Sequence, residues 1–106
     1  MSTEALEARF ETTMRDIYWR ASSECRYRPA FFLRMVGEHG GVGAARAMIS
    51  GTASEGFAKL RDLGRLDLSV ETLVLQERWR VLFTDEARAL ARQRLDGAQA
   101  ARSALS

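Results

Sequence analysis

The feature that most constrains the fold is the spacing of apolar residues in the first quarter of the chain. Between positions 3 and 25 the apolar residues recur every three or four positions, as Leu6, Phe10, Met14, Ile17, Ala21 and Cys25. This period places them on one face of a helix. Ser2 or Thr3 can cap its start through a side-chain hydroxyl. The pattern therefore predicts a helix over about 3–25 that buries one long apolar stripe.

Shorter helices are predicted along the middle of the chain. Pro29 suits the first turn of a second helix, which we expect to end near Glu38. Gly40 can adopt the left-handed conformation that closes many helices. A third helix is expected over about 42–50, and a fourth is expected to be capped by Ser54.

The fourth helix is expected to end at Gly64, and the segment that follows it is ambiguous. Residues 65–70 alternate between polar and apolar side chains as a strand would. An isolated strand has no partner elsewhere in this sequence, so we expect an extended segment followed by a helix capped by Ser69. The last helix is expected to begin after Thr84 and to end at Gly97.

These elements together predict an all-α fold, a compact bundle of five or six helices around a single core. At 106 residues the chain is long enough for one domain that buries about two-thirds of its unfolded surface. We expect this domain to span residues 1–97. Residues 98–106 are small and polar, and we expect them to form a mobile tail.

The composition limits the compartment and the ligand class. Cys25 is the single cysteine, so an internal disulfide is excluded and a reducing compartment is expected. The acidic, amphipathic N-terminus does not resemble a signal peptide, and no apolar run is long enough to cross a bilayer. We therefore expect a cytoplasmic protein that does not act at a membrane. The formal net charge is only +2, so nucleic-acid binding would need a local basic patch.

The residues needed for catalysis are scarce. Cys25 and His39 are the one pair that could act as nucleophile and base, and they lie on different predicted helices. Cys25 also falls on the apolar stripe, where a buried and inert thiol is the usual outcome. Glu38 and His39 are neighbours, and neighbours seldom supply two of the four ligands of a zinc site. We therefore expect no enzymatic activity, no cofactor and no metal.

The glycine-rich stretch GEHGGVGAA, residues 37–45, matches no phosphate-binding motif. It lacks the Lys-Ser/Thr of a phosphate loop, and a predicted helix precedes it where a dinucleotide site needs a strand. We interpret it as a corner between two helices. A weak anion site remains an alternative, formed by the backbone at Gly41 and Gly43 with Arg46 one turn further.

Residues 15–34 carry the densest mixture of arginine and aromatic side chains. Arginine contacts phosphate and aromatic rings stack on bases, so this segment is the best candidate nucleic-acid surface. Its candidate contact residues are Tyr18, Trp19, Arg20, Arg26, Tyr27, Arg28 and Arg34. The alternative is a half-buried helix whose arginines pair with acidic neighbours on the solvent side.

Residues 28–95 resemble a bacterial helical domain of uncharacterised function. The resemblance rests on GGVGAA at 40–45, GRLDL at 64–68 and LF at 82–83. The chain departs from that pattern at Arg46, where a lysine is usual, and at 76–78, where a proline is common. Such domains occur alone or attached to nucleases and ATPases of the restriction and defence kind. The resemblance implies a non-catalytic helical accessory module and identifies no ligand.

Asp67 lies between two leucines within the GRLDL motif. An unpaired carboxylate in a buried crossing would be costly, so we expect it to accept backbone hydrogen bonds or to pair with Arg65 or Arg46. This pattern indicates a structural polar anchor.

The leading functional hypothesis is a small module that binds a protein partner or associates with itself, within a bacterial nucleic-acid-processing or defence system. The alternative is nucleic-acid binding through the arginine and aromatic patch at residues 15–34.

Overall fold

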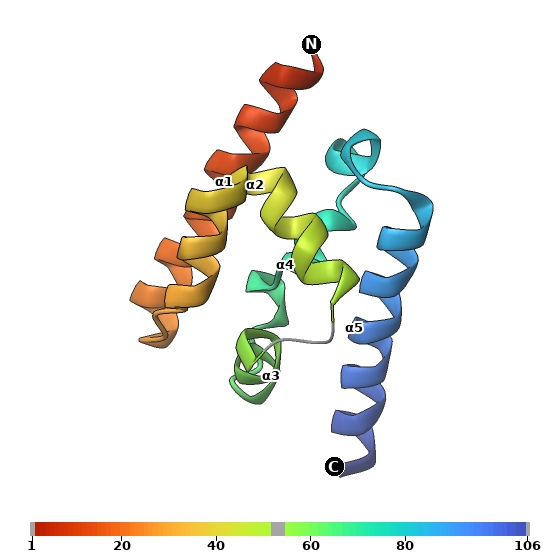
Figure 1. The fold of residues 1–106 in the computed structure, drawn as a ribbon. Coiled ribbons are helices and arrows are strands. Elements are labelled where there is room, and N and C mark those ends of the chain that lie inside the picture. The colour runs from red at the N-terminus through yellow and green to blue at the C-terminus, as the bar shows by residue number, and fades with distance from the viewer. Residues whose placement is uncertain (1, 52–54, 106) are drawn as a thin grey trace.

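The computed structural model describes residues 2–51 and 55–105, and helices are the only regular elements in those ranges (Figure 1). In chain order they are α1 (Thr3–Cys25), α2 (Ala30–Ser50), α3 (Glu55–Asp62), the 3₁₀ helix η1 (Leu66–Leu68), α4 (Val70–Val74), the 3₁₀ helix η2 (Glu77–Leu82) and α5 (Asp85–Leu105). The predicted all-α fold is confirmed.

The long helices form two sides of the molecule with short elements between them (Figure 1). The first half of α2 runs back along α1, and its second half turns away towards α5. Beneath this turn lie α3 and α4. No helix within the described ranges is long and apolar enough to cross a membrane.

The turn within α2 is made by Gly40, whose φ of 73° and ψ of 171° are not helical. The predicted corner between two helices is therefore confirmed. A positive φ with an extended ψ is accessible almost only to glycine. The sequence could indicate this break because the requirement is local to one residue.

The core is centred on aromatic residues from both ends of the chain. Phe10 of α1 packs edge-on against Trp79 and Phe83, with ring centroids 5.2 Å apart in each pair. Aliphatic side chains of α2, α4 and α5 surround these rings. All three aromatic side chains are buried, which fixes the first half of α1 against η2.

A buried ion pair joins three helices beside this core. The side chain of Glu71 in α4 is 6% exposed, and its Oε2 accepts a hydrogen bond from Arg94 of α5 at 3.1 Å. The same guanidinium donates to the carbonyl oxygens of Met48, Ile49 and Gly51 at the end of α2. It thus satisfies carbonyls that a helix end leaves without partners.

Three of the expected helix starts are confirmed, and the first is capped by Ser2, whose hydroxyl accepts from the Ala5 amide at 3.2 Å. The Ser69 hydroxyl accepts from the Thr72 amide at 3.1 Å, and the Thr84 hydroxyl accepts from the Ala87 amide at 3.0 Å. The expected cap at Ser54 lies outside the described residues. Helix α3 ends at Asp62, and Gly64 follows with a φ of 70°.

Two expectations about local structure are wrong. The extended segment before Ser69 is instead a 3₁₀ helix, because the Ser69 and Thr72 hydroxyls both donate to the carbonyl of Leu66 and close the turn. The last helix does not end at Gly97 but continues to Leu105. Ala98 is buried in one apolar cluster with Phe57, so packing after Gly97 favours continuation. The mobility expected for residues 98–106 stays a prediction.

Candidate interaction site

The backbone at the glycine corner is already occupied by a carboxylate of this chain. The Gly41 amide donates to Oε1 of Glu11 in α1 at 3.0 Å. Arg46 donates to the carbonyl of Leu82 at 2.9 Å, at the end of η2. The Gly41 amide and Arg46, two of the three groups of the predicted anion site, therefore have partners within the fold, and the site at Gly41, Gly43 and Arg46 stays a prediction. The sequence showed the donors but not the carboxylate thirty positions away.

Gly41 is also the point where α1 and α2 approach most tightly. A Cβ atom at this position would lie 2.5 Å from the Cα of Glu11 and 2.8 Å from its Cβ. Real side chains do not make such contacts, so the helix crossing needs a residue without a side chain here. The corner is structural.

Asp67 is paired but not buried. It accepts two hydrogen bonds from Arg65, at 3.0 and 3.1 Å, and its side chain is 54% exposed. Arg65 is one of its two expected partners; the expected buried setting is wrong, because Asp67 projects from η1 towards solvent. The guanidinium of Arg65 also binds Glu24 of α1 at 2.7 Å, and Arg20 binds the same carboxylate at 2.9 Å.

These contacts shift the ionisation of both carboxyl groups. Hydrogen bonds from Arg20 and then from Arg65 lower the pKa of Glu24 to about 2. The hydrogen bond from Arg65 lowers the pKa of Asp67 in the same direction. The network ties the end of α1 to η1 by ion pairs that are ionised at neutral pH.

Cys25 and His39 lie at different levels of the α1–α2 pair. His39 lies two residues before Gly41, and Gly41 is where α2 crosses α1 at Glu11. Cys25 lies about 20 Å beyond Glu11 along α1, at a rise of about 1.5 Å per residue. The Cys25 sulfur contacts Nη1 of Arg65 at 3.9 Å, and His39 is 3.8 Å from Glu38. Within residues 2–51 and 55–105 no cluster of three potential metal ligands occurs.

The arginine and aromatic segment is divided between paired and unpaired side chains. Arg20 binds Glu24 and Arg34 binds Glu38, each pair one helical turn apart. Arg26 and Arg28 are exposed and have no ion pair in the described ranges. Tyr27 is partly buried. The rings of Tyr18 and Trp19 pack edge-on, with their centroids 5.2 Å apart. The structure therefore leaves only part of the predicted patch available to a ligand.

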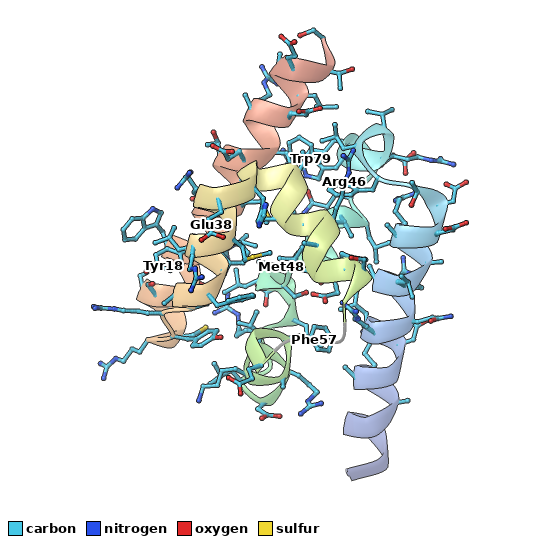
Figure 2. The ribbon with its side chains drawn as sticks, viewed as in Figure 1. Tyr18, Glu38, Arg46, Met48, Phe57 and Trp79 are labelled. Atoms are coloured by element: carbon cyan, nitrogen blue, oxygen red, sulfur yellow. The ribbon has the colours of Figure 1, made fainter. Side chains whose placement is uncertain are left out.

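A cavity of about 510 Å³ opens between α1, α2, α3 and α4. Its apolar wall contains Ile17, Tyr18, Phe32, Met48, Phe57 and Leu68. Tyr18, Met48 and Phe57 are labelled in Figure 2 and come from three different helices. The volume falls within the range of about 300–1,000 Å³ typical of ligand pockets. Sequence analysis missed this pocket, because its wall combines residues that are far apart in the chain.

Two large aromatic side chains stand exposed beside the cavity. Phe31, at the start of α2, lines the cavity and is 62% exposed. Trp19 is not part of the lining; its ring centroid lies 5.2 Å from that of the lining residue Tyr18, and its side chain is 65% exposed. Arg28 and Glu55 bring charges to the same lining. We call this cavity, with Phe31 and Trp19 beside it, the aromatic pocket.

Comparison of the chain with protein-family models, with curated proteins and with solved structures gives no match. The contacts and the cavity described above are therefore the basis for a functional proposal.

Proposed function

We propose that this chain is a small non-catalytic helical module that binds a protein partner by receiving apolar side chains of that partner in the aromatic pocket. The observation that carries the proposal is the apolar cavity of about 510 Å³ with Phe31 and Trp19 exposed beside it. Exposed aromatic side chains next to a pocket are typical of the residues that dominate binding energy in protein interfaces. A second copy of the chain would be one form of such a partner.

The distribution of reactive groups supports a non-catalytic role. Cys25 and His39 are separated along α1 and α2, so a nucleophile does not meet a base. The buried carboxylate of Glu71 is held by Arg94 in a helix-capping network. From the resemblance of residues 28–95, we further propose a partner within a bacterial nucleic-acid-processing or defence system.

Nucleic-acid binding through residues 15–34 has less support. Arg20 and Arg34 are held by ion pairs with acidic neighbours, and Tyr27 is partly buried. A salt-titrated binding assay with DNA and RNA tests this alternative. Tight binding that weakens steeply with salt and is lost on combining Arg26→Ala with Arg28→Ala would favour it over the pocket.

The pocket itself is tested by selecting displayed peptides on the purified chain. We expect enrichment of sequences with two or more large apolar residues, because these side chains fill the cavity. Their binding should be lost when Met48→Trp fills the cavity and weakened by Phe31→Ala. Val81→Ala is the matched control, because Val81 is 79% exposed on η2 and lies outside the lining.

Two results would refute the proposal. One is a selection without enrichment, and the other is a set of peptides that bind the Met48→Trp variant as well as the native chain. Circular dichroism must show that each variant is folded. Light scattering on the native chain then separates self-association from binding to another protein, since only self-association raises the mass of the chain alone.

A further inference from the structure

One oxygen of the Glu71 carboxylate is left without a hydrogen bond in the lining of the aromatic pocket. Its Oε2 accepts from Arg94 at 3.1 Å, whereas its Oε1 accepts from no group in residues 2–51 and 55–105. The fully buried side-chain atoms without a partner in these ranges are Ser22 Oγ and Trp79 Nε1, so Oε1 keeps a small area open to solvent. Because Glu71 lines the cavity and its side chain is only 6% exposed, this area faces the cavity.

Glu71 lies at the buried end of the cavity. The lining residues that are buried with it are apolar, apart from Ser69. The Ser69 hydroxyl already donates to the carbonyl of Leu66 and accepts from the Thr72 amide. The exposed lining residues, which mark the opening, are Arg28, Ala30, Phe31 and Glu55. An occupant that reaches the buried end therefore meets one free acceptor in an apolar wall.

Charge does not select the occupant of this pocket. Arg94 neutralises the carboxylate of Glu71, and at the opening Arg28 and Glu55 carry opposite charges. A charged group that moved to the buried end would lose its hydration without meeting an uncompensated counter-charge, which is costly. The free oxygen of Glu71 therefore favours a donor that is neutral.

Tryptophan is the side chain that combines a neutral donor with the shape of this cavity. Its indole is the largest aromatic side chain, and its N–H donates but does not accept. Phenylalanine or leucine would displace solvent from Oε1 of Glu71 without replacing the lost hydrogen bond. A tyrosine hydroxyl also donates, but its ring is smaller and its oxygen adds an acceptor beside a carboxylate.

We propose that the partner segment bound by the aromatic pocket inserts a tryptophan whose indole N–H donates to Oε1 of Glu71. The inference rests on the proposed function and names the anchor residue of the partner. The bond between Oε2 and Arg94 holds the carboxylate in place, so the acceptor is already oriented before the partner binds. The rest of the indole ring packs against the apolar lining.

The test begins with displayed peptides selected on the full native chain, where we expect one position to be enriched in Trp over Phe and Leu. The selected peptide is then synthesised with a fluorescein label, once with Trp and once with 3-benzothienylalanine. This analogue keeps the bicyclic shape and replaces the N–H by sulfur. Fluorescence anisotropy should show that it binds about tenfold to hundredfold more weakly, the range for a lost hydrogen bond to a charged group.

Glu71→Gln makes the matching change in the protein. Glutamine keeps an oxygen for Arg94, and its amide nitrogen then puts a donor where the free acceptor was. The Trp peptide should lose most of its advantage over the sulfur analogue on this variant. Glu86→Gln is the control, because Glu86 is exposed on α5 and lies outside the lining, and it should leave the ratio of the two affinities unchanged. Circular dichroism checks that both variants are folded.

The outcomes separate this inference from the proposed function. Equal binding of the two peptides by the native chain, a measurement that needs no variant, overturns the tryptophan anchor but leaves the pocket as a binding site. A selection that enriches Phe, Tyr or Leu without Trp has the same meaning. A folded Glu71→Gln chain that keeps the full advantage of the Trp peptide also overturns the anchor. A selection without enrichment refutes both proposals.

Discussion

Substituting Gly41 by alanine should destabilise the fold at the crossing of α1 and α2. The new Cβ would lie 2.5 Å from the Cα of Glu11, a main-chain atom that a side-chain rotation cannot move. Helix α1 would have to shift by about 1 Å or more to reach ordinary carbon contact. That shift would also stretch the hydrogen bond from the Gly41 amide to Glu11, which is 3.0 Å long.

The size of this effect follows from three contributions. Overpacking of a close contact costs about 1–3 kcal/mol. Weakening a charge-assisted hydrogen bond costs about 1.5–3 kcal/mol at most, and less at this part-buried site. Alanine in place of glycine within a helix returns about 1 kcal/mol. The net expected loss is about 2–4 kcal/mol, which lowers Tm by at least about 8 °C in a domain of this size.

The chain contains its own controls for this substitution. A Cβ on Gly37 or on Gly97 would meet no atom within 4 Å, and both residues lie within helices. Gly37→Ala and Gly97→Ala should therefore stabilise the fold by up to about 1 kcal/mol. Thermal unfolding followed by circular dichroism, with urea unfolding as a second measure, compares the three variants. A Gly41→Ala protein with a Tm at or above that of the native chain would refute the reasoning.

Three further predictions follow from the ion pairs. Arg94→Met should lower the free energy of unfolding by about 3–5 kcal/mol, because it leaves the buried carboxylate of Glu71 without its partner. Arg94→Lys should restore only part of this loss. Urea unfolding measures both variants, and a small loss in Arg94→Met would contradict the structural role of the Glu71–Arg94 pair. The pKa values of Glu24 and Asp67 are lowered in the fold, so the unfolded chain binds more protons in acid. The stabilisation from these two carboxylates should therefore be complete above about pH 4.5 and disappear as the pH falls towards about 2. In this range the free energy of unfolding of the native chain should fall more steeply with pH than that of Glu24→Gln. Asp67→Ala should lower Tm by a few degrees at most, because the pair with Arg65 is exposed; a larger fall in a thermal melt would show a stronger anchor than the geometry indicates.

Local interactions account for what the sequence predicted correctly. The helix over 3–25 follows from the spacing of its apolar residues, and the structure places α1 at Thr3–Cys25. The caps at Ser69 and Thr84 join residues three positions apart, and the break in α2 depends on the backbone freedom of Gly40 alone. Each of these features is decided within about one helical turn, so no knowledge of the rest of the fold is needed.

Tertiary structure decided the position of the candidate site and the partners of the buried polar groups. The aromatic pocket combines side chains of α1, α2, α3 and α4, and no local pattern predicts which of their faces meet. Glu11 reaches Gly41 across thirty positions and accepts a hydrogen bond from an amide of the predicted anion site. Glu71, which nothing in its local sequence marked as buried, becomes so because Arg94 lies against it at the end of α2. The sequence alone therefore determined the first helix, the helix starts at Ser69 and Thr84 and the break at Gly40, where neighbours along the chain interact. Tertiary packing decided which polar groups are satisfied and where a cavity is left, because both depend on residues that only folding brings together.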